Sequence, residues 1–210
     1  MKEYNLKLEK FLFPLISKIK KPMILEFGVH AGISTKRFIK ICSKNKGHLY
    51  SVDVVDYKKL SNSPRWTFFN CRDDNFKFLR KKIPNKFDVI YLDSFHEAEH
   101  VKKIIFQYFG LLKVGGYFFI DDISHLPYLK NEKRESFYCE INNQETFQKI
   151  LEIYNQNQDA FDLDMNFKSS GLCIIKKLKN KNLKNSKKIL SRKNSLKNFV
   201  RIIWRKIRKN

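Results

Sequence analysis

The run HEAEH, from His96 to His100, combines residue types that can do chemistry with a spacing known from metal enzymes. Two imidazoles one helical turn apart can hold zinc, and the glutamate between them can activate water, as in zinc peptidases. A zinc peptidase also needs a third ligand, and no downstream histidine motif supplies one. Both histidines also project off the apolar face that begins at Val101. We therefore expect His96 to act with residues outside this helix, and Glu97 and His100 to be ordinary helix residues.

Three acidic residues end two apolar runs of the sequence. Asp93 ends the run at 87–93, and the pair Asp121 and Asp122 ends the run at 116–121. If both runs are strands of one parallel sheet, their carboxyl ends meet at the edge where open α/β sheets bind ligands. Three carboxylates together are unfavourable without a cation, and a hard ion such as Mg²⁺ suits oxygen ligands. The spacing therefore predicts a divalent metal site.

A glycine-containing loop follows an earlier apolar run. The segment ILEFGVHAGIST, residues 24–35, has the pattern E-x-G-x-x-x-G, which differs from the loops of dinucleotide enzymes and nucleotide hydrolases. Its glycines allow close backbone approach to a ligand, and the following helix offers N–H groups for a carboxylate. The next run ends at Asp53, which can accept hydrogen bonds from both hydroxyls of a ribose. The pattern indicates a cofactor that carries both an amino acid and a ribose.

Apolar runs alternate with helical patterns along the chain, which is typical of a parallel sheet covered by helices. We expect an α/β fold, a Rossmann-like doubly wound sheet of five parallel strands followed by an antiparallel hairpin. The expected parallel strands are 23–27, 48–53, 66–70, 87–93 and 116–121, the hairpin strands are 161–167 and 172–177, and the helices are 34–44, 73–82, 97–109 and 145–155.

Over residues 22–177 the chain resembles the class I S-adenosylmethionine-dependent methyltransferases, whose domain is a seven-stranded sheet of this kind. The resemblance implies S-adenosylmethionine as the cofactor. In place of the usual Gly-Asp after the third strand, this chain has Asn70-Cys71. By motif position, the residues implied to bind the cofactor are Glu26, Gly28 and Gly32 in the loop, Asp53 at the ribose and Asp73 near the adenine.

The pattern D-x-x-H after the fourth strand, followed by an acid pair after the fifth, resembles metal-dependent sugar O-methyltransferases of macrolide biosynthesis and their glycan-cluster relatives. This similarity implies Asp93, Asp121 and Asp122 as ligands of Mg²⁺ or another divalent cation, and His96 as the general base. The implied reaction methylates a hydroxyl of a sugar, a glycan or a related small molecule. Family members commonly have Asp-Gly-Ser-His where this chain has Asp-Ser-Phe-His. No Asn/Asp-Pro-Pro-Tyr-like stretch follows the fourth strand, which favours oxygen over nitrogen as the acceptor.

The net charge of +22 is concentrated at the C-terminus, where residues 176–210 contain fifteen Lys or Arg residues and no acid. We expect a short helix in residues 1–21 that packs on the domain, the methyltransferase domain at 22–177, and a basic, partly disordered tail at 178–210. Within that tail, residues 198–209 have the pattern of an amphipathic helix. Such a helix fits peripheral contact with an anionic membrane.

Two other functions remain open. A basic tail also attracts nucleic acid, so one alternative is an RNA methyltransferase, although no recognition module is visible and nucleic acid is the less favoured partner. A second alternative is a non-catalytic S-adenosylmethionine-binding protein. The four cysteines form no C-x-x-C pair, which fits reduced thiols in the cytoplasm, and no run reaches the ~20 apolar residues that span a bilayer. We expect a cytoplasmic protein, in which the tail would favour the inner face of the membrane. The sequence does not indicate an oligomeric state.

Overall fold

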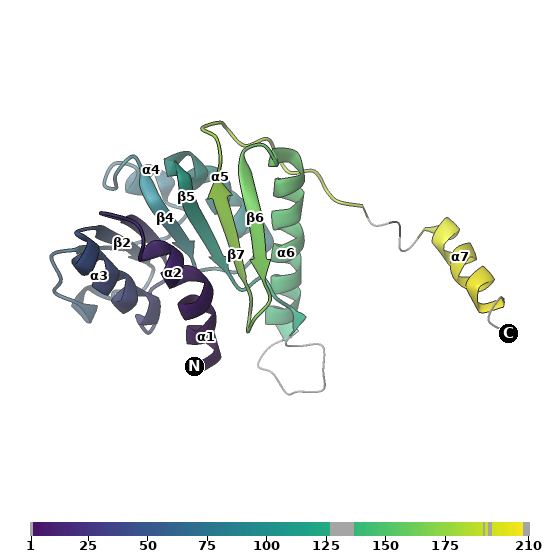
Figure 1. Ribbon diagram of the computed structural model, residues 1–210, viewed down its shortest axis with the longest axis horizontal. Coiled ribbons are helices and arrows are strands. Elements are labelled where there is room, and N and C mark those ends of the chain that lie inside the picture. The colour runs from purple at the N-terminus through teal and green to yellow at the C-terminus, as the bar shows by residue number, and fades with distance from the viewer. Residues whose placement is uncertain (1, 127–136, 191, 193–194, 208–210) are drawn as a thin grey trace.

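Seven strands form one mixed sheet in the order β3-β2-β1-β4-β5-β7-β6 (Figure 1). The structure, a computed structural model, describes residues 2–126, 137–190, 192 and 195–207. β1 to β5 are parallel, and β7 pairs antiparallel with both β5 and β6. The strands are β1 Met23–Phe27, β2 His48–Asp53, β3 Trp66–Asn70, β4 Phe87–Leu92, β5 Leu112–Asp121, β6 Phe161–Asn166 and β7 Leu172–Lys177. The predicted fold, five parallel strands with a terminal hairpin, is confirmed.

The helices lie in three groups along the chain. An N-terminal segment consists of α1 (Lys2–Lys7), the π-helical η1 (Leu8–Leu12) and α2 (Phe13–Ile16). The crossover helices are α3 (Ile33–Asn45), α4 (Phe76–Leu79) and α5 (Ala98–Tyr108), with short 3₁₀ turns η2 (Lys58–Leu60) and η3 (Phe109–Leu111). The last two are α6 (Phe137–Asn157), before the hairpin, and α7 (Leu196–Ile207), in the tail.

Helices cover both faces of the sheet, because successive strand side chains point to opposite faces. On one face, the N-terminal segment and α3 bury an apolar cluster that includes Leu8, Phe38 and Tyr91. On the other face, α5 and α6 bury a larger cluster that includes Ile90 and Ile105 (Figure 1). The fold thus has three layers, and its loops at the carboxyl ends of β1 to β5 gather at one edge.

Three elements differ in extent from the sequence prediction. The helix expected at 73–82 is only α4, because Asp73 and Asp74 bind side chains of other segments. β5 begins at Leu112 rather than 116, and its irregular pairing with β4 accommodates Gly115 at φ +80°. The helix expected at 145–155 begins by 137, and within this added part Asn143 is buried and its side chain donates to the backbone oxygen of Ser124.

The two chain ends differ in how they meet the domain. Leu8, Leu12 and Ile16 are fully buried, so the N-terminal segment is part of the core. After β7 the chain runs along α6, where Asn157 binds the backbone of Lys184 through both its side-chain atoms. α7 overlaps the amphipathic helix expected at 198–209 but begins two residues earlier, and residues 208 and 209 lie outside the described residues. None of the helices in the described residues has the length and hydrophobicity required to cross a membrane.

Candidate functional site

A cavity of about 780 Å³ lies at the carboxyl ends of β1 to β4. The strand order reverses at β1 and β4, and this switch point is where open α/β sheets bind ligands. The volume is in the range of small-molecule sites. The residues that line the cavity come from four successive loops: Gly28 to Ala31, Ile33 and Ser34 after β1, Val52 to Val54 at β2, Cys71 to Asp73 after β3, and Asp93 to His96 with His100 after β4.

Beneath the first loop, the buried carboxyl group of Glu26 joins three elements. Ser34 and Thr35, in the first turn of α3, donate hydroxyl hydrogen bonds of 2.6 and 2.9 Å to it, and Ser51 of β2 donates one of 2.6 Å. Trp66 of β3 in turn donates to the hydroxyl of Ser51 at 2.9 Å. Burial raises the pKa of Glu26 to about 7, although the three hydroxyl donors oppose that shift. Glu26 therefore supports the loop from below and does not line the cavity.

At Gly28 the backbone of the loop after β1 lies directly against the backbone of the loop after β4. Its φ is +94°, and a Cβ there would lie 1.8 Å from the backbone oxygen of Asp93. The N–H of Asp93 donates to the backbone oxygen of Phe27 at 2.8 Å, and this hydrogen bond holds the two loops together. The glycine is therefore required by the close approach of another backbone. This contact places the loop that is predicted to bind the cofactor beside Asp93, the first acid of the predicted metal site.

Asp53 holds the same loop from the end of β2. Its Oδ2 accepts the N–H of Val29 at 2.7 Å, and its Oδ1 accepts the N–H of Val55 at 2.9 Å. Oδ2 also accepts the N–H of His30 at 3.4 Å. Each carboxylate oxygen has two lone pairs, so Oδ1 can still accept a hydroxyl from a ligand in the cavity. Asp53 lines the cavity and is partly exposed, as a ribose acceptor must be.

Another part of the cavity wall is a hydrogen-bonded group of Asp73, Ser94 and His100. Oδ2 of Asp73 lies 2.5 Å from the hydroxyl of Ser94 and 2.8 Å from Nε2 of His100. Burial alone would raise the pKa of Asp73, but the hydrogen bonds from His100 and Ser94 outweigh burial and lower it. His100, which we expected to be an ordinary helix residue, lines the cavity instead. Its spacing from His96 was the available signal, but the sequence does not show that its partner is Asp73.

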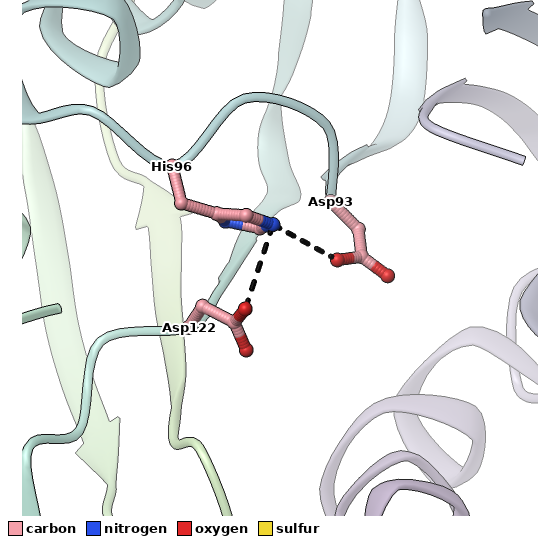
Figure 2. Close-up of side chains that lie close together, drawn as sticks. All are labelled: Asp93, His96 and Asp122. Atoms are coloured by element: carbon pink, nitrogen blue, oxygen red, sulfur yellow. Dashed lines mark ion pairs between the residues drawn. The ribbon is translucent and has the colours of Figure 1, made fainter. Parts of the chain in front are cut away.

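Asp93, His96 and Asp122 converge beside the cavity (Figure 2). Nε2 of His96 lies 3.5 Å from Oδ1 of Asp93 and 3.5 Å from Oδ2 of Asp122. One donor atom from each residue lies within 4.8 Å of the others, which is compatible with a single cation between them. All three side chains are partly exposed, so a ligand can reach them.

Asp121 points away from this cluster. Its carboxyl group is fully buried under the N-terminal segment, where Oδ1 accepts a hydrogen bond from the ammonium of Lys7, and Oδ2 one of 2.8 Å from Tyr91. Asp122 instead has φ +58°, a strained conformation that turns its side chain toward His96. Burial and the nearby Asp93 raise the pKa of Asp121, and the Lys7 ammonium opposes this shift.

Lys7 ties the acid pair to the rest of the molecule. Besides Asp121, its fully buried Nζ donates to Oγ of Ser170 at 2.6 Å and to the backbone oxygen of Gly171 at 3.3 Å. It also lies 3.7 Å from Oδ1 of Asp122. Tyr91 extends the link, because its hydroxyl lies 3.0 Å from Asp93 as well as 2.8 Å from Asp121. No pattern in the sequence indicates that Lys7, 114 residues from Asp121, reaches this site.

The structure thus divides the residues predicted from sequence into three sets. Among the described residues, those predicted ones that line the cavity are Gly28, Asp53, Asp73, Asp93 and His96. Asp122 joins two of them at the cavity's edge. Glu26, Gly32 and Asp121 lie behind this layer: Glu26 and Asp121 are buried, and Gly32, at φ +70°, is the N-cap of α3.

The central part of the chain is similar in sequence to a known family. The sequence model of a family described as a methyltransferase domain matches residues 25–123. These residues include β1 to β5 and every loop around the cavity. None of the curated proteins matches the chain.

The solved structures that share this fold include three methyltransferases. MycE from the mycinamycin biosynthetic pathway, in complex with Mg and SAH, has a TM-score of 0.56 at 18% identity over 76% of this chain and 46% of MycE. SAH-bound PaMTH1 from Podospora anserina gives 0.62 at 17%, covering 85% and 87%. A Staphylococcus aureus structure assigned as a caffeoyl-CoA O-methyltransferase gives 0.61 at 20%, covering 83% of each chain. The chain spans about half the length of MycE.

Replacement of Lys7 by Met is expected to lower the free energy of unfolding by ~3–5 kcal/mol, because it leaves the buried Asp121 carboxylate without its cation. Asp121→Asn in the same background should recover most of that loss. Urea denaturation of both variants measures the effect, with Lys10→Met, an exposed lysine of the same segment, as control. If Lys7→Met matches Lys10→Met in stability, the ion pair does not hold the site together.

The stability contributed by Glu26 should depend on pH. Because its pKa is raised from 4.5 to about 7, the folded state retains a proton that the unfolded state has lost. The contribution of Glu26 to the free energy of unfolding is therefore largest below pH 4.5. It falls by about 3 kcal/mol as the pH rises through about 7, measured relative to a Glu26→Gln variant. Urea denaturation at intervals across this range measures the difference, with exposed Glu97→Gln as control. Parallel pH profiles for wild type and Glu26→Gln would contradict the shifted pKa.

Proposed function

We propose that this class I S-adenosylmethionine-dependent methyltransferase transfers its methyl group to a hydroxyl oxygen of a sugar, a glycan or a related small molecule, with help from a divalent cation. The observation that carries the proposal is the convergence of Asp93, His96 and Asp122 beside the cavity. Two of these residues, Asp93 and His96, also line it, so an acceptor bound between them would lie next to the cofactor.

In this proposal the cavity residues position the cofactor. Asp53 accepts the ribose hydroxyls, while the loop from Gly28 to Ser34 and the first turn of α3 receive the methionine part. Asp73, held by Ser94 and His100, borders the remaining space on the adenine side. The cofactor supplies an electrophilic methyl group on a sulfonium. The protein must therefore activate an oxygen of the acceptor and hold it in line with the bond between the sulfur and the methyl carbon.

The cation would be held by Asp93 and Asp122. Carboxylates are the ligands that Mg²⁺ prefers, and their oxygens lie within the span of one ion. Bound there, the ion would lower the pKa of a coordinated acceptor hydroxyl. Asp121 takes a supporting role in this version of the site, because both its oxygens already accept hydrogen bonds inside the protein. Lys7 forms its shorter ion pair with Asp121, while the partly exposed Asp93 and Asp122 face the position proposed for the ion.

His96 would remove the proton of the acceptor hydroxyl. Its ring is partly exposed and aimed between the two acids (Figure 2). The carboxylates of Asp93 and Asp122, each 3.5 Å from Nε2, would stabilise the imidazolium that forms. The backbone oxygen of His96 lies 3.4 Å from the hydroxyl of Thr146 on α6, which helps fix the loop that carries the ring.

The test begins with labelled S-adenosylmethionine offered to nucleotide sugars, lipid-linked glycans and RNA, each with Mg²⁺ and with a chelator. We expect transfer to a sugar hydroxyl that stops with the chelator and returns with Mg²⁺. With that acceptor, His96→Ala should lower kcat at least 100-fold at unchanged Mg²⁺ affinity, as loss of a general base does. Asp122→Asn should weaken the apparent Mg²⁺ affinity at least about tenfold.

The control is Glu97→Gln, an exposed neighbour of His96 that should leave both quantities unchanged. Calorimetric binding of S-adenosylhomocysteine to every variant shows that the cofactor cavity is intact. Transfer that survives the chelator would disprove the metal-assisted mechanism. Weaker Mg²⁺ affinity in His96→Ala would make the imidazole a ligand rather than the base, and transfer to RNA alone would replace the acceptor class.

A further inference from the structure

The tail helix α7 presents an apolar face that no described part of the domain covers. Residues 196–207 form three turns, and all the large apolar side chains in them are exposed. At ~100° per residue, six of these side chains fall within an arc of about 140°. They are Leu196, Phe199, Val200, Ile203, Trp204 and Ile207.

The opposite face of α7 is polar and positively charged. Lys197, Arg201 and Arg205 follow one another at intervals of four residues and lie together beside the apolar arc. Arg192 and the pairs at 187–188 and 208–209 add to this charge in sequence, and residues 176–210 contain no acid to offset it. Long basic side chains next to an apolar arc can extend toward charged groups while the arc is buried.

We propose that α7 lies in the surface of an anionic lipid bilayer and attaches the methyltransferase domain to it. The apolar arc would enter the boundary between headgroups and acyl chains, and the basic side chains would contact the anionic headgroups. Charge complementarity selects this occupant, because fifteen basic residues and no acid in the last 35 favour a negative surface. The helix is too short and too polar to span the bilayer, so it lies along the surface.

Two other occupants fit α7 less well. RNA would satisfy the basic side chains, but phosphate binding does not require an apolar arc of this width. A second copy of α7 would cover the arc, but it would bring two strongly basic segments side by side, which is unfavourable. The bilayer is the partner that uses both faces of the helix at once.

The test measures binding of the full chain to vesicles and needs no knowledge of the methyl acceptor. Vesicles of phosphatidylcholine are compared with vesicles of phosphatidylcholine and phosphatidylglycerol by co-sedimentation. We expect partitioning to be at least about tenfold stronger with phosphatidylglycerol and to weaken at high salt. Trp204 is one of only two tryptophans, so its emission should shift to shorter wavelength on binding.

A matched pair of variants separates the two faces. Ile202 and Ile203 are adjacent, identical in type and both 43% exposed, but only Ile203 lies within the apolar arc. Ile203→Ser should weaken partitioning about tenfold, and Ile202→Ser should leave it nearly unchanged. Both variants keep every charge, so any difference between them comes from the apolar face.

Several outcomes would overturn the proposal. Wild-type binding that is equal on neutral and anionic vesicles, or equal effects of Ile202→Ser and Ile203→Ser, would exclude a helix lying on one face in an anionic surface. Tight RNA binding that displaces the vesicles and is insensitive to Ile203→Ser would assign the tail to nucleic acid. A dimer in solution that Ile203→Ser dissociates would assign the arc to a second copy.

Discussion

The wall of the cavity formed by β1, β2 and α3 depends on the buried carboxyl group of Glu26. This carboxyl group accepts hydroxyl hydrogen bonds from the first turn of α3 and from β2, and through Ser51 it is linked to Trp66 of β3. A buried carboxyl group without such partners would be costly, so these elements are held in one arrangement. The turn between β1 and α3, which forms one wall of the cavity, follows from that arrangement.

A second constraint is the close backbone contact at Gly28. Because the loop after β1 approaches the loop after β4 with no room for a side chain between them, the wall of the cavity at Gly28 is in direct contact with Asp93 of the acid cluster. Asp93 is held there by its own backbone hydrogen bond to Phe27, at the end of β1. The separation between this wall of the cavity and the acid cluster is thereby set by backbone rather than by flexible side chains, which favours precise positioning.

The fold could be predicted from sequence because buried parallel strands and their covering helices have distinct periods, and the hairpin after the last helix has its own pattern. Strand ends also predicted which loops gather around the cavity. What they could not predict is the direction of each side chain. Asp121 shares the face of Phe119 and so points under the N-terminal segment, while Asp122 adopts a left-handed conformation and points into the site. The adjacent letters DD show neither fact.

The contacts of His100 and Lys7 could not be predicted from sequence for a different reason. Each depends on a partner distant in sequence: Asp73 is 27 residues from His100, and Asp121 is 114 residues from Lys7. Local patterns carry no information on such pairs, and the helical period even placed His100 off the apolar face. A single sequence therefore indicates which loops meet, but the partners of buried charged groups require the three-dimensional arrangement.

The contacts of Lys7 also bear on the order in which the chain can fold. Its partners are the end of β5 and the turn just before β7, 163 residues away at Ser170, and β7 enters the sheet between β5 and β6. Contacts across such separations form late, because they close long loops. The ammonium of Lys7 can therefore reach all of its buried partners only after β7 has joined the sheet. The position of Lys7 beside Asp121 and Asp122 thus depends on the turn before β7 as well as on the end of β5, which couples the support of the acid pair to the last strand of the sheet.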